Sequence, residues 1–171
     1  MPKPIEVTLP GDREIRITRV FDAPRDLIFD CYTRPELVQR WLLGPPGWSM
    51  PVCEVDLRVG GRYRYVWRND ASGSEFGSVG EHREIAAPSL LVTTERMILA
   101  GAPAATEPVD GPDAALNRLE LSDESGGRTT LTLTMRYPST EMRDMVLKTG
   151  MADGVAISFD RLDGVLAEAG A

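Results

Sequence analysis

Residues 129–137 carry the sequence Thr-Thr-Leu-Thr-Leu-Thr-Met-Arg-Tyr, in which apolar and polar side chains alternate. Alternation with a period of two is typical of a strand that buries one face. Immediately afterwards the apolar spacing becomes helical, and one stripe is formed by Leu147, Met151, Val155, Phe159, Leu162 and Leu166. Met142 and Met145 lie on another side of that helical wheel, so we expect a short helix over 140–148 and a longer one over 150–168, with the break at Thr149.

The chain before this stretch alternates in the same way over most of its length. Residues 14–21 form one expected strand, and two short helices follow that begin near Pro24 and Pro35. From Met50 to Pro138 the pattern is that of strands joined by short turns, including a hairpin at Gly60-Gly61. This order predicts an α+β chain with an antiparallel meander. Residues 1–12 form a Pro-rich N-terminal extension, and residues 100–114 form a long Pro- and Gly-rich loop.

The composition excludes several classes of function. The chain has 171 residues, which fits one domain, and 19 basic against 26 acidic residues give a net charge of −7. Duplex nucleic acid and anionic membrane surfaces require a basic footprint, so we expect neither as a partner. With one histidine and two cysteines, we expect no Cys/His zinc site and no cofactor. The absence of a long apolar run and of a signal-peptide core predicts a cytoplasmic protein.

Aromatic residues gather on one expected strand. Tyr63, Tyr65 and Trp67 occupy alternate positions and therefore share a face, whereas Arg62, Arg64 and Arg68 share the other. Core packing is one interpretation of the aromatic face, and the wall of a ligand cavity is the other. Trp41, beside the loop 44–47, is open to the same two interpretations.

Two polar residues stand at positions where apolar ones are expected. Arg19 lies on the apolar face of the first strand, and a buried guanidinium needs a carboxylate partner. Glu95 is the candidate for that ion pair; alternatively, Arg19 is a cavity cation for an anionic ligand. His82 lies within a strand, either as a half-exposed polar residue or as a general base. Asp153, Asp160 and Asp163 are expected on the solvated face of the last helix.

Four local motifs occur together in a characteristic order. They are Arg19-Val20-Phe21-Asp22-Ala23-Pro24-Arg25, Trp41-Leu42-Leu43-Gly44-Pro45, Asp56-Leu57-Arg58-Val59-Gly60-Gly61-Arg62-Tyr63, and Thr149-Gly150-Met151-Ala152-Asp153-Gly154 with Asp160-Arg161-Leu162. Together they resemble the START-like, or SRPBCC, superfamily, and within it the branch named for the activator of the 90-kDa heat-shock chaperone ATPase. The resemblance covers approximately residues 14–167.

This resemblance implies a helix-grip fold over a single domain, residues 13–169. In such a fold a curved antiparallel sheet of about six to seven strands wraps around the long C-terminal helix, and two short helices follow the first strand. A cavity is expected between the sheet and that helix. Val155 stands where the family often has Trp, which would leave more space against the sheet.

We expect a domain that binds a small apolar or amphipathic molecule without catalysis. The candidate ligand-binding residues are Tyr63, Tyr65, Trp67, Trp41, Arg19, His82, Met151, Val155 and Phe159. A cyclase-, hydrolase- or lyase-type enzyme is the alternative, and it would need polar groups such as His82, Arg19 or Glu95 to converge in the cavity. A chaperone-interacting module is the third hypothesis. We expect no metal site and assign no catalytic residue, and a homodimer is a further possibility.

Overall fold

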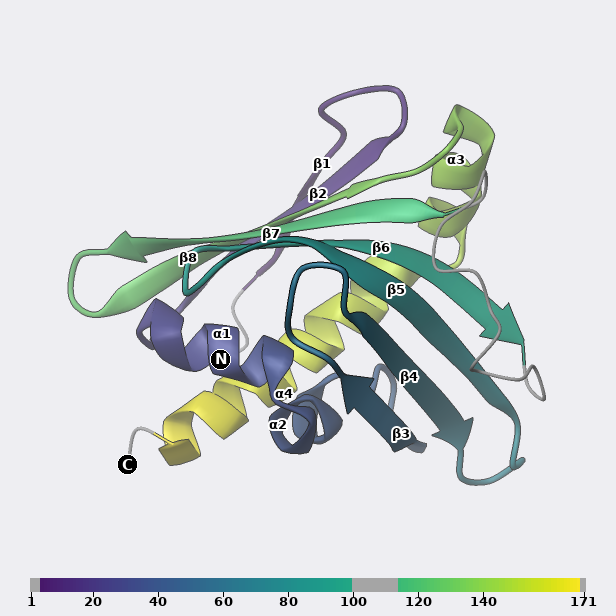
Figure 1. Ribbon diagram of the computed structural model, residues 1–171, viewed down its shortest axis with the longest axis horizontal. Helices are drawn as coiled ribbons and strands as arrows, with labels where there is room; N and C mark the ends of the chain where they lie inside the picture. Colours follow the sequence, from purple (N-terminus) through teal and green to yellow (C-terminus); the bar gives the residue numbers. More distant parts are fainter. Residues whose placement is uncertain (1–3, 100–113, 170–171) are drawn as a thin grey trace.

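The computed structural model describes residues 4–99 and 114–169 (Figure 1). Two strands, β1 (Glu6–Thr8) and β2 (Glu14–Phe21), precede the short helices α1 (Arg25–Thr33) and α2 (Pro35–Trp41). Six further strands then follow in order: β3 (Trp48–Val55), β4 (Arg62–Asn69), β5 (Glu75–Ala86), β6 (Leu90–Leu99), β7 (Ala115–Glu124) and β8 (Arg128–Arg136). The chain ends with α3 (Thr140–Lys148) and α4 (Met151–Ala169).

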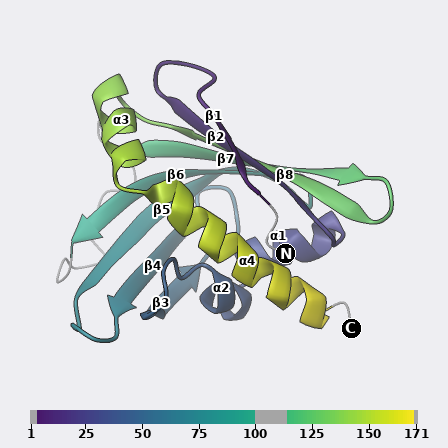
Figure 2. The ribbon, with the colours of Figure 1, turned by 180° about the vertical axis from the view of Figure 1, so that it is seen from behind.

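The strands form one antiparallel sheet in the order β1-β2-β8-β7-β6-β5-β4-β3. The sheet is strongly curved, and α4 crosses its concave face diagonally, as Figure 2 shows from the side opposite to Figure 1. The two short helices α1 and α2 lie beside α4 at one end, and α3 lies at the other end. This arrangement confirms the expected helix-grip fold.

The described residues contain eight strands rather than the six to seven expected. The extra strand is β1, which lies in the expected N-terminal extension and pairs with β2 at the edge of the sheet. Three residues pair here, too few to stand out as a periodic pattern in the sequence. The expected long loop at 100–114 lies outside the described residues, apart from Ala114.

Strand alternation places the core on the concave face. Ile15, Ile17 and Phe21 of β2 and Leu131 of β8 are fully buried there, as the alternating pattern predicts. The apolar stripe of α4 faces them, and Phe159 packs edge-on against Phe21 with ring centroids 5.3 Å apart. Burial of this amphipathic face is what fixes the helix on the sheet.

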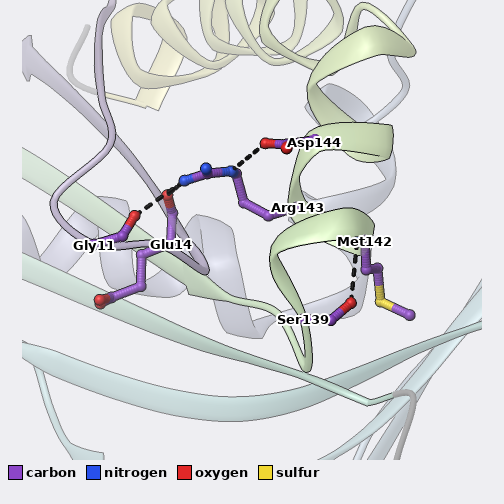
Figure 3. A network of polar contacts seen from close by, with 6 residues as sticks. All are labelled: Gly11, Glu14, Ser139, Met142, Arg143 and Asp144. Atoms are coloured by element: carbon purple, nitrogen blue, oxygen red, sulfur yellow. Dashed lines mark hydrogen bonds and ion pairs between the residues drawn. The ribbon is translucent and has the colours of Figure 1, made fainter.

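The break between the two C-terminal helices falls where the sequence predicts it. Gly150 has a φ of +79°, a left-handed conformation that ends α3 and that glycine adopts without strain. At the start of α3, the Ser139 hydroxyl accepts a hydrogen bond from the Met142 N–H at 3.1 Å (Figure 3).

A buried arginine ties α3 to the turn between β1 and β2. The Arg143 guanidinium donates to the backbone carbonyls of Gly11 at 3.0 Å and of Glu14 at 3.3 Å, and to the Asp144 carboxylate at 2.8 Å (Figure 3). Hydrogen bonds from a charged donor are stronger than neutral ones. The position of α3 is therefore set by this contact as well as by the residues at its junction with α4.

Candidate functional site

The aromatic face of β4 lies on the concave side of the sheet. Tyr63 and Tyr65 stand opposite Gly80 and Ser78 of β5, and Trp67 stands opposite Phe76. The rings form a continuous row, with centroids 4.8 Å apart between Tyr63 and Tyr65 and 5.9 Å apart between Tyr65 and Trp67. This row continues the concave surface away from the core that β2, β7 and β8 form.

Burial along this row decreases with distance from the core. Tyr63 is buried, whereas Tyr65 and Trp67 are half-buried. The Trp67 indole N–H donates to the Leu42 carbonyl at 2.7 Å, which joins the strand to the segment after α2. Met97 stands opposite Ser78 and belongs to the same face, and its side chain is 56% exposed. The concave surface is thus only partly covered in the region of β4 to β6.

Glycine at position 80 is required by the way Tyr63 packs. A Cβ atom at Gly80 would lie 1.9 Å from the Thr94 carbonyl oxygen and 2.4 Å from the Tyr63 ring. The Tyr63 ring therefore lies flat on the backbone of β5. From there its hydroxyl donates to the Thr94 carbonyl at 2.9 Å and lies 3.5 Å from the Ser78 hydroxyl.

Glu95 is the polar centre of this surface. Its position on β6 is opposite Ala115 of β7, whose side chain is a single methyl group. The Ser78 hydroxyl donates to the Glu95 carboxylate at 3.5 Å. Burial raises the pKa of Glu95, and hydrogen bonding from Asn117 and Ser78 only partly offsets that effect.

Three tyrosine side chains interact electrostatically with the Glu95 carboxylate. Burial raises the pKa values of Tyr63, Tyr65 and Tyr137, and the negative charge of the nearby Glu95 raises each of them further. Within the described residues, no lysine or arginine forms an ion pair with Glu95. Among the described residues, the Glu95 carboxylate is therefore hydrogen-bonded by neutral side chains and has no cation partner.

The helix side of the same region is apolar. Met151 and Val155 of α4 are half-buried and pack against the main core, whereas Phe159, one turn further on, is 2% exposed and belongs to the core itself. Trp41 is fully buried, and its indole N–H donates to the Cys31 carbonyl at 2.8 Å. Of the two interpretations of Trp41, the structure therefore places it in core packing.

The expected Arg19–Glu95 ion pair is wrong. Arg19 is 2% exposed and its guanidinium donates a hydrogen bond to the Asp163 carboxylate of α4. The Asp160 carboxylate lies 3.4 Å from the same guanidinium. The two aspartates expected on a solvated helix face therefore turn part of their surface inward, because α4 crosses the sheet directly over β2. The Arg19 guanidinium also lies 4.7 Å from the centre of the Phe21 ring, a cation–π contact.

His82 is buried, not half-exposed. Only 3% of its surface is exposed, and its ring lies 6.0 Å from that of Tyr63. Both ring nitrogens lack a hydrogen-bond partner among the described residues. Burial lowers the pKa of His82, and the nearby Asp56 opposes that effect. Among the described residues, no nucleophile or acid is hydrogen-bonded to the imidazole.

A surface pocket of about 410 Å³ lies away from the concave face, where β6 and β7 approach the start of α1. Its charged lining is internally paired: Arg25 with Asp123 at 3.2 Å, and Arg118 with Glu120 at 3.3 Å.

No described group of three or more His, Cys, Asp or Glu side chains could hold a metal ion. Cys31 and Cys53 are free thiols, and burial raises the pKa of each to about 11. None of the helices that the structure describes is long and apolar enough to cross a membrane.

The order of the elements and the position of α4 describe the fold. A comparison with models of protein families identifies the family. A family model described as Activator of Hsp90 ATPase homolog 1-like protein matches residues 22–167. The chain belongs to this family. Membership in the Hsp90 ATPase activator homolog 1-like family places the fold within the SRPBCC type, as the four sequence motifs predict. No curated protein matches the chain significantly.

Solved structures agree with the family assignment. A crystal structure of a protein from Rhodobacter sphaeroides is 26% identical, with a TM-score of 0.84 over 96% of this chain and 99% of that one. Protein Ms6760 from Mycobacterium smegmatis is 25% identical, with a TM-score of 0.79 over 95% and 97% of the two chains. PFC0360w, described as an HSP90 activator from Plasmodium falciparum, shares the fold at 22% identity and a TM-score of 0.51, covering 73% of each chain.

The sequence interpretation missed the polar surroundings of the concave face. It considered Glu95 as a partner for Arg19 and as one of the polar groups that an enzyme would need in the cavity, but it did not single out Ser78 or Asn117. A signal was present, since Glu95 shares its strand face with Leu91 and Met97, where a carboxylate is unexpected. Which side chains surround that carboxylate depends on the register of three strands, which the residues of β6 alone do not specify.

Proposed function

We propose that this family member binds a small apolar or amphipathic molecule between the concave face of the sheet and the N-terminal half of α4. The observation that carries the proposal is the incomplete covering of that face. Tyr65, Trp67 and Met97 on the sheet and Met151 and Val155 on the helix all retain exposed surface. Concave surfaces of aromatic and aliphatic side chains with a few convergent polar groups are typical of ligand sites.

Of the candidate residues named from the sequence, four carry this proposal: Tyr65, Trp67, Met151 and Val155. Tyr63, Trp41 and Phe159 support the site from beneath, because they have almost no exposed surface. Arg19 pairs through its Nη2 atom with Asp163 and Asp160 of α4, whereas its Nε and Nη1 atoms are buried and have no hydrogen-bond partner among the described residues. A cytoplasmic location belongs to the same proposal, and the two free cysteines support it because such thiols persist in a reducing compartment.

The enzyme hypothesis has weaker support. It needs polar groups that converge on one reacting centre, but Arg19 is paired with aspartates of α4 and His82 has no hydrogen-bonded partner among the described residues. The chaperone hypothesis rests on the family description and on the printed description of the Plasmodium falciparum protein. A pull-down from cell lysate that enriches the 90-kDa chaperone would favour it over small-molecule binding.

The proposal is tested with 1-octanol as a neutral amphipathic probe, followed by backbone amide NMR. We expect shift changes at Ser78, Met97 and Val155, and none at Val79 or Ile98, which form a separate cluster on the other face of the sheet. The variant Val155→Trp fills the space beside the helix and should abolish these changes. Ile157→Trp, two residues further along α4 at a position that is 36% exposed, is the matched control and should leave them intact.

Two outcomes would overturn the proposal. One is the absence of any shift on the concave face at concentrations of 1-octanol near its solubility limit. The other is an equal effect of Val155→Trp and Ile157→Trp, which would place the probe elsewhere. Mass spectrometry of material released from natively purified protein adds an independent observation, since a retained amphipathic compound would identify the natural ligand class.

A further inference from the structure

The concave site contains two hydrogen-bond acceptors that the described residues satisfy only in part or not at all. One is the Glu95 carboxylate, which receives neutral donors from Ser78 and Asn117 but no cation. The other is the Asn117 side-chain oxygen, which is buried and has no partner among the described residues. A buried acceptor without a donor is unfavourable, so such groups commonly mark a place where a ligand or an ordered water completes the network.

These two acceptors lie on adjacent strands of the same concave face. Glu95 pairs across the sheet with Ala115, and Asn117 follows two residues later on β7, where alternation returns its side chain to the same side. The sheet therefore presents a carboxylate and an amide oxygen together. No described residue donates a hydrogen bond to the Asn117 oxygen.

The rings around the acceptors favour a positive charge. Tyr63 and Tyr65 lie in a row with tilted rings, and Tyr137, directly after β8, interacts electrostatically with Glu95. The faces of aromatic rings carry partial negative charge and attract ammonium groups. A carboxylate, an amide oxygen and phenol rings are together complementary to a cation with several N–H donors, and they would repel an anion.

From this juxtaposition we infer that the ligand of the concave site is an amphipathic amine. Its ammonium group pairs with Glu95 and donates to the Asn117 oxygen, and its apolar part lies along Tyr65, Trp67 and Val155. This inference rests on the proposed function and adds the chemical class of the ligand. It also differs from the anionic ligand that Arg19 suggested, because the Arg19 side chain is 1% exposed and its Nη2 atom pairs with Asp163 and Asp160.

The test compares three probes with the same alkyl chain: n-octylamine, 1-octanol and octanoate, titrated by calorimetry and amide NMR at neutral pH. We expect n-octylamine to bind about tenfold more tightly than 1-octanol, the gain that a charge-assisted hydrogen bond in a half-buried site supplies. Octanoate should bind more weakly than 1-octanol, because its carboxylate would face that of Glu95.

Variants separate the charge from the shape of the site. Glu95→Gln keeps the side-chain size and should remove the preference for n-octylamine while leaving the affinity for 1-octanol within about twofold. Asn117→Leu should weaken n-octylamine binding several-fold and spare 1-octanol. Glu84→Gln, at an exposed position on β5, is the matched control and should change neither affinity. Thermal melting of each variant shows that the fold is retained.

The outcomes distinguish this inference from the proposed function. Equal affinities of n-octylamine and 1-octanol, or a preference for the amine that survives Glu95→Gln, would overturn the inference while small-molecule binding stands. Tighter binding of octanoate would overturn it as well. If none of the three probes perturbs the concave face, the proposed function itself fails, and the amine inference fails with it.

Discussion

Arg19 of β2 donates a hydrogen bond to Asp163 of α4, a residue 144 positions further along the chain. The guanidinium is almost completely buried, whereas the Asp163 side chain is 34% exposed. The pair therefore joins the second strand of the sheet to the last helix at the boundary between core and solvent. The sequence leaves Arg19 open between an ion pair and a role in ligand binding. In the structure, Arg19 positions α4.

Arg19→Met should destabilise the protein by about 2 kcal/mol, less than a fully buried pair would cost because the aspartates reach solvent. Asp163→Asn should lower the free energy of unfolding by less than Arg19→Met does. Asp160→Asn should lower it by less again, because the Asp160 carboxylate lies 3.4 Å from the Arg19 guanidinium. Urea denaturation measures these differences. The binding of 1-octanol should be unchanged in Arg19→Met, and a selective loss of binding with unchanged stability would assign Arg19 to the ligand site instead.

Glu95→Gln should raise the stability of the free protein at neutral pH. Burial raises the pKa of this carboxyl, so its favourable contribution exists below the ordinary value of about 4.5 and is lost as pH rises through the folded-state pKa. At neutral pH the ionised group carries a net cost, and the amide should recover about 1 kcal/mol, or roughly 3 °C in Tm. Glu84→Gln should leave Tm unchanged, and a lower Tm for Glu95→Gln would show that the charge is compensated in the folded state.

His82 should make the protein sensitive to mild acid. Burial lowers its pKa in the folded state, so the unfolded chain takes up a proton first as pH falls. The free energy of unfolding should be constant above about pH 6.5, which is the ordinary pKa of histidine, and should fall progressively below that pH. In His82→Leu, the free energy of unfolding measured by urea denaturation should depend less on pH between pH 7.5 and 5 (roughly the range over which histidine titrates). An unaltered slope in that variant would assign the acid sensitivity to other groups.

Gly80→Ala should be among the most damaging single changes in the sheet. The added methyl would lie 1.9 Å from the Thr94 carbonyl oxygen and against the Tyr63 ring, so either β5 or Tyr63 must move, at a cost of at least about 2 kcal/mol. Gly164→Ala on the exposed side of α4 meets no atom within 4 Å and should stabilise the helix by about 0.5–1 kcal/mol. Thermal melting compares the two variants, and similar Tm values would contradict the close packing of Tyr63 on β5.

Arg143→Leu should loosen α3 without unfolding the sheet. The variant loses the hydrogen bonds to the Gly11 and Glu14 carbonyls, which Figure 3 shows at the turn before β2. Amide hydrogen exchange over residues 140–148 should accelerate by about tenfold, while residues of β7 and β8 keep their protection. Ser139→Ala should accelerate exchange at the first turn of α3 chiefly, since it removes only the cap. Uniform acceleration across the whole chain in Arg143→Leu would mean that α3 and the sheet unfold together.

The amino-acid sequence by itself determined the elements, their order and the family. Alternation in β2 and β8 and the helical stripe of α4 are local patterns, because a strand or helix that buries one face must repeat its apolar residues with the period of that element. The break at Gly150 is equally local, since the conformation that ends α3 is one that glycine adopts freely. Eight strands rather than six or seven is a small departure, because β1 is too short to show a period.

Only the tertiary structure decided which polar groups meet. Arg19 pairs with Asp163 instead of Glu95 because α4 crosses the sheet above β2, and the angle of that crossing is not encoded within either segment. Glu95 lies beside Ser78 and Asn117 because the registers of β5, β6 and β7 bring three separate strands into line. A shift of one residue in any of these pairings would turn the carboxylate's neighbours to the opposite face.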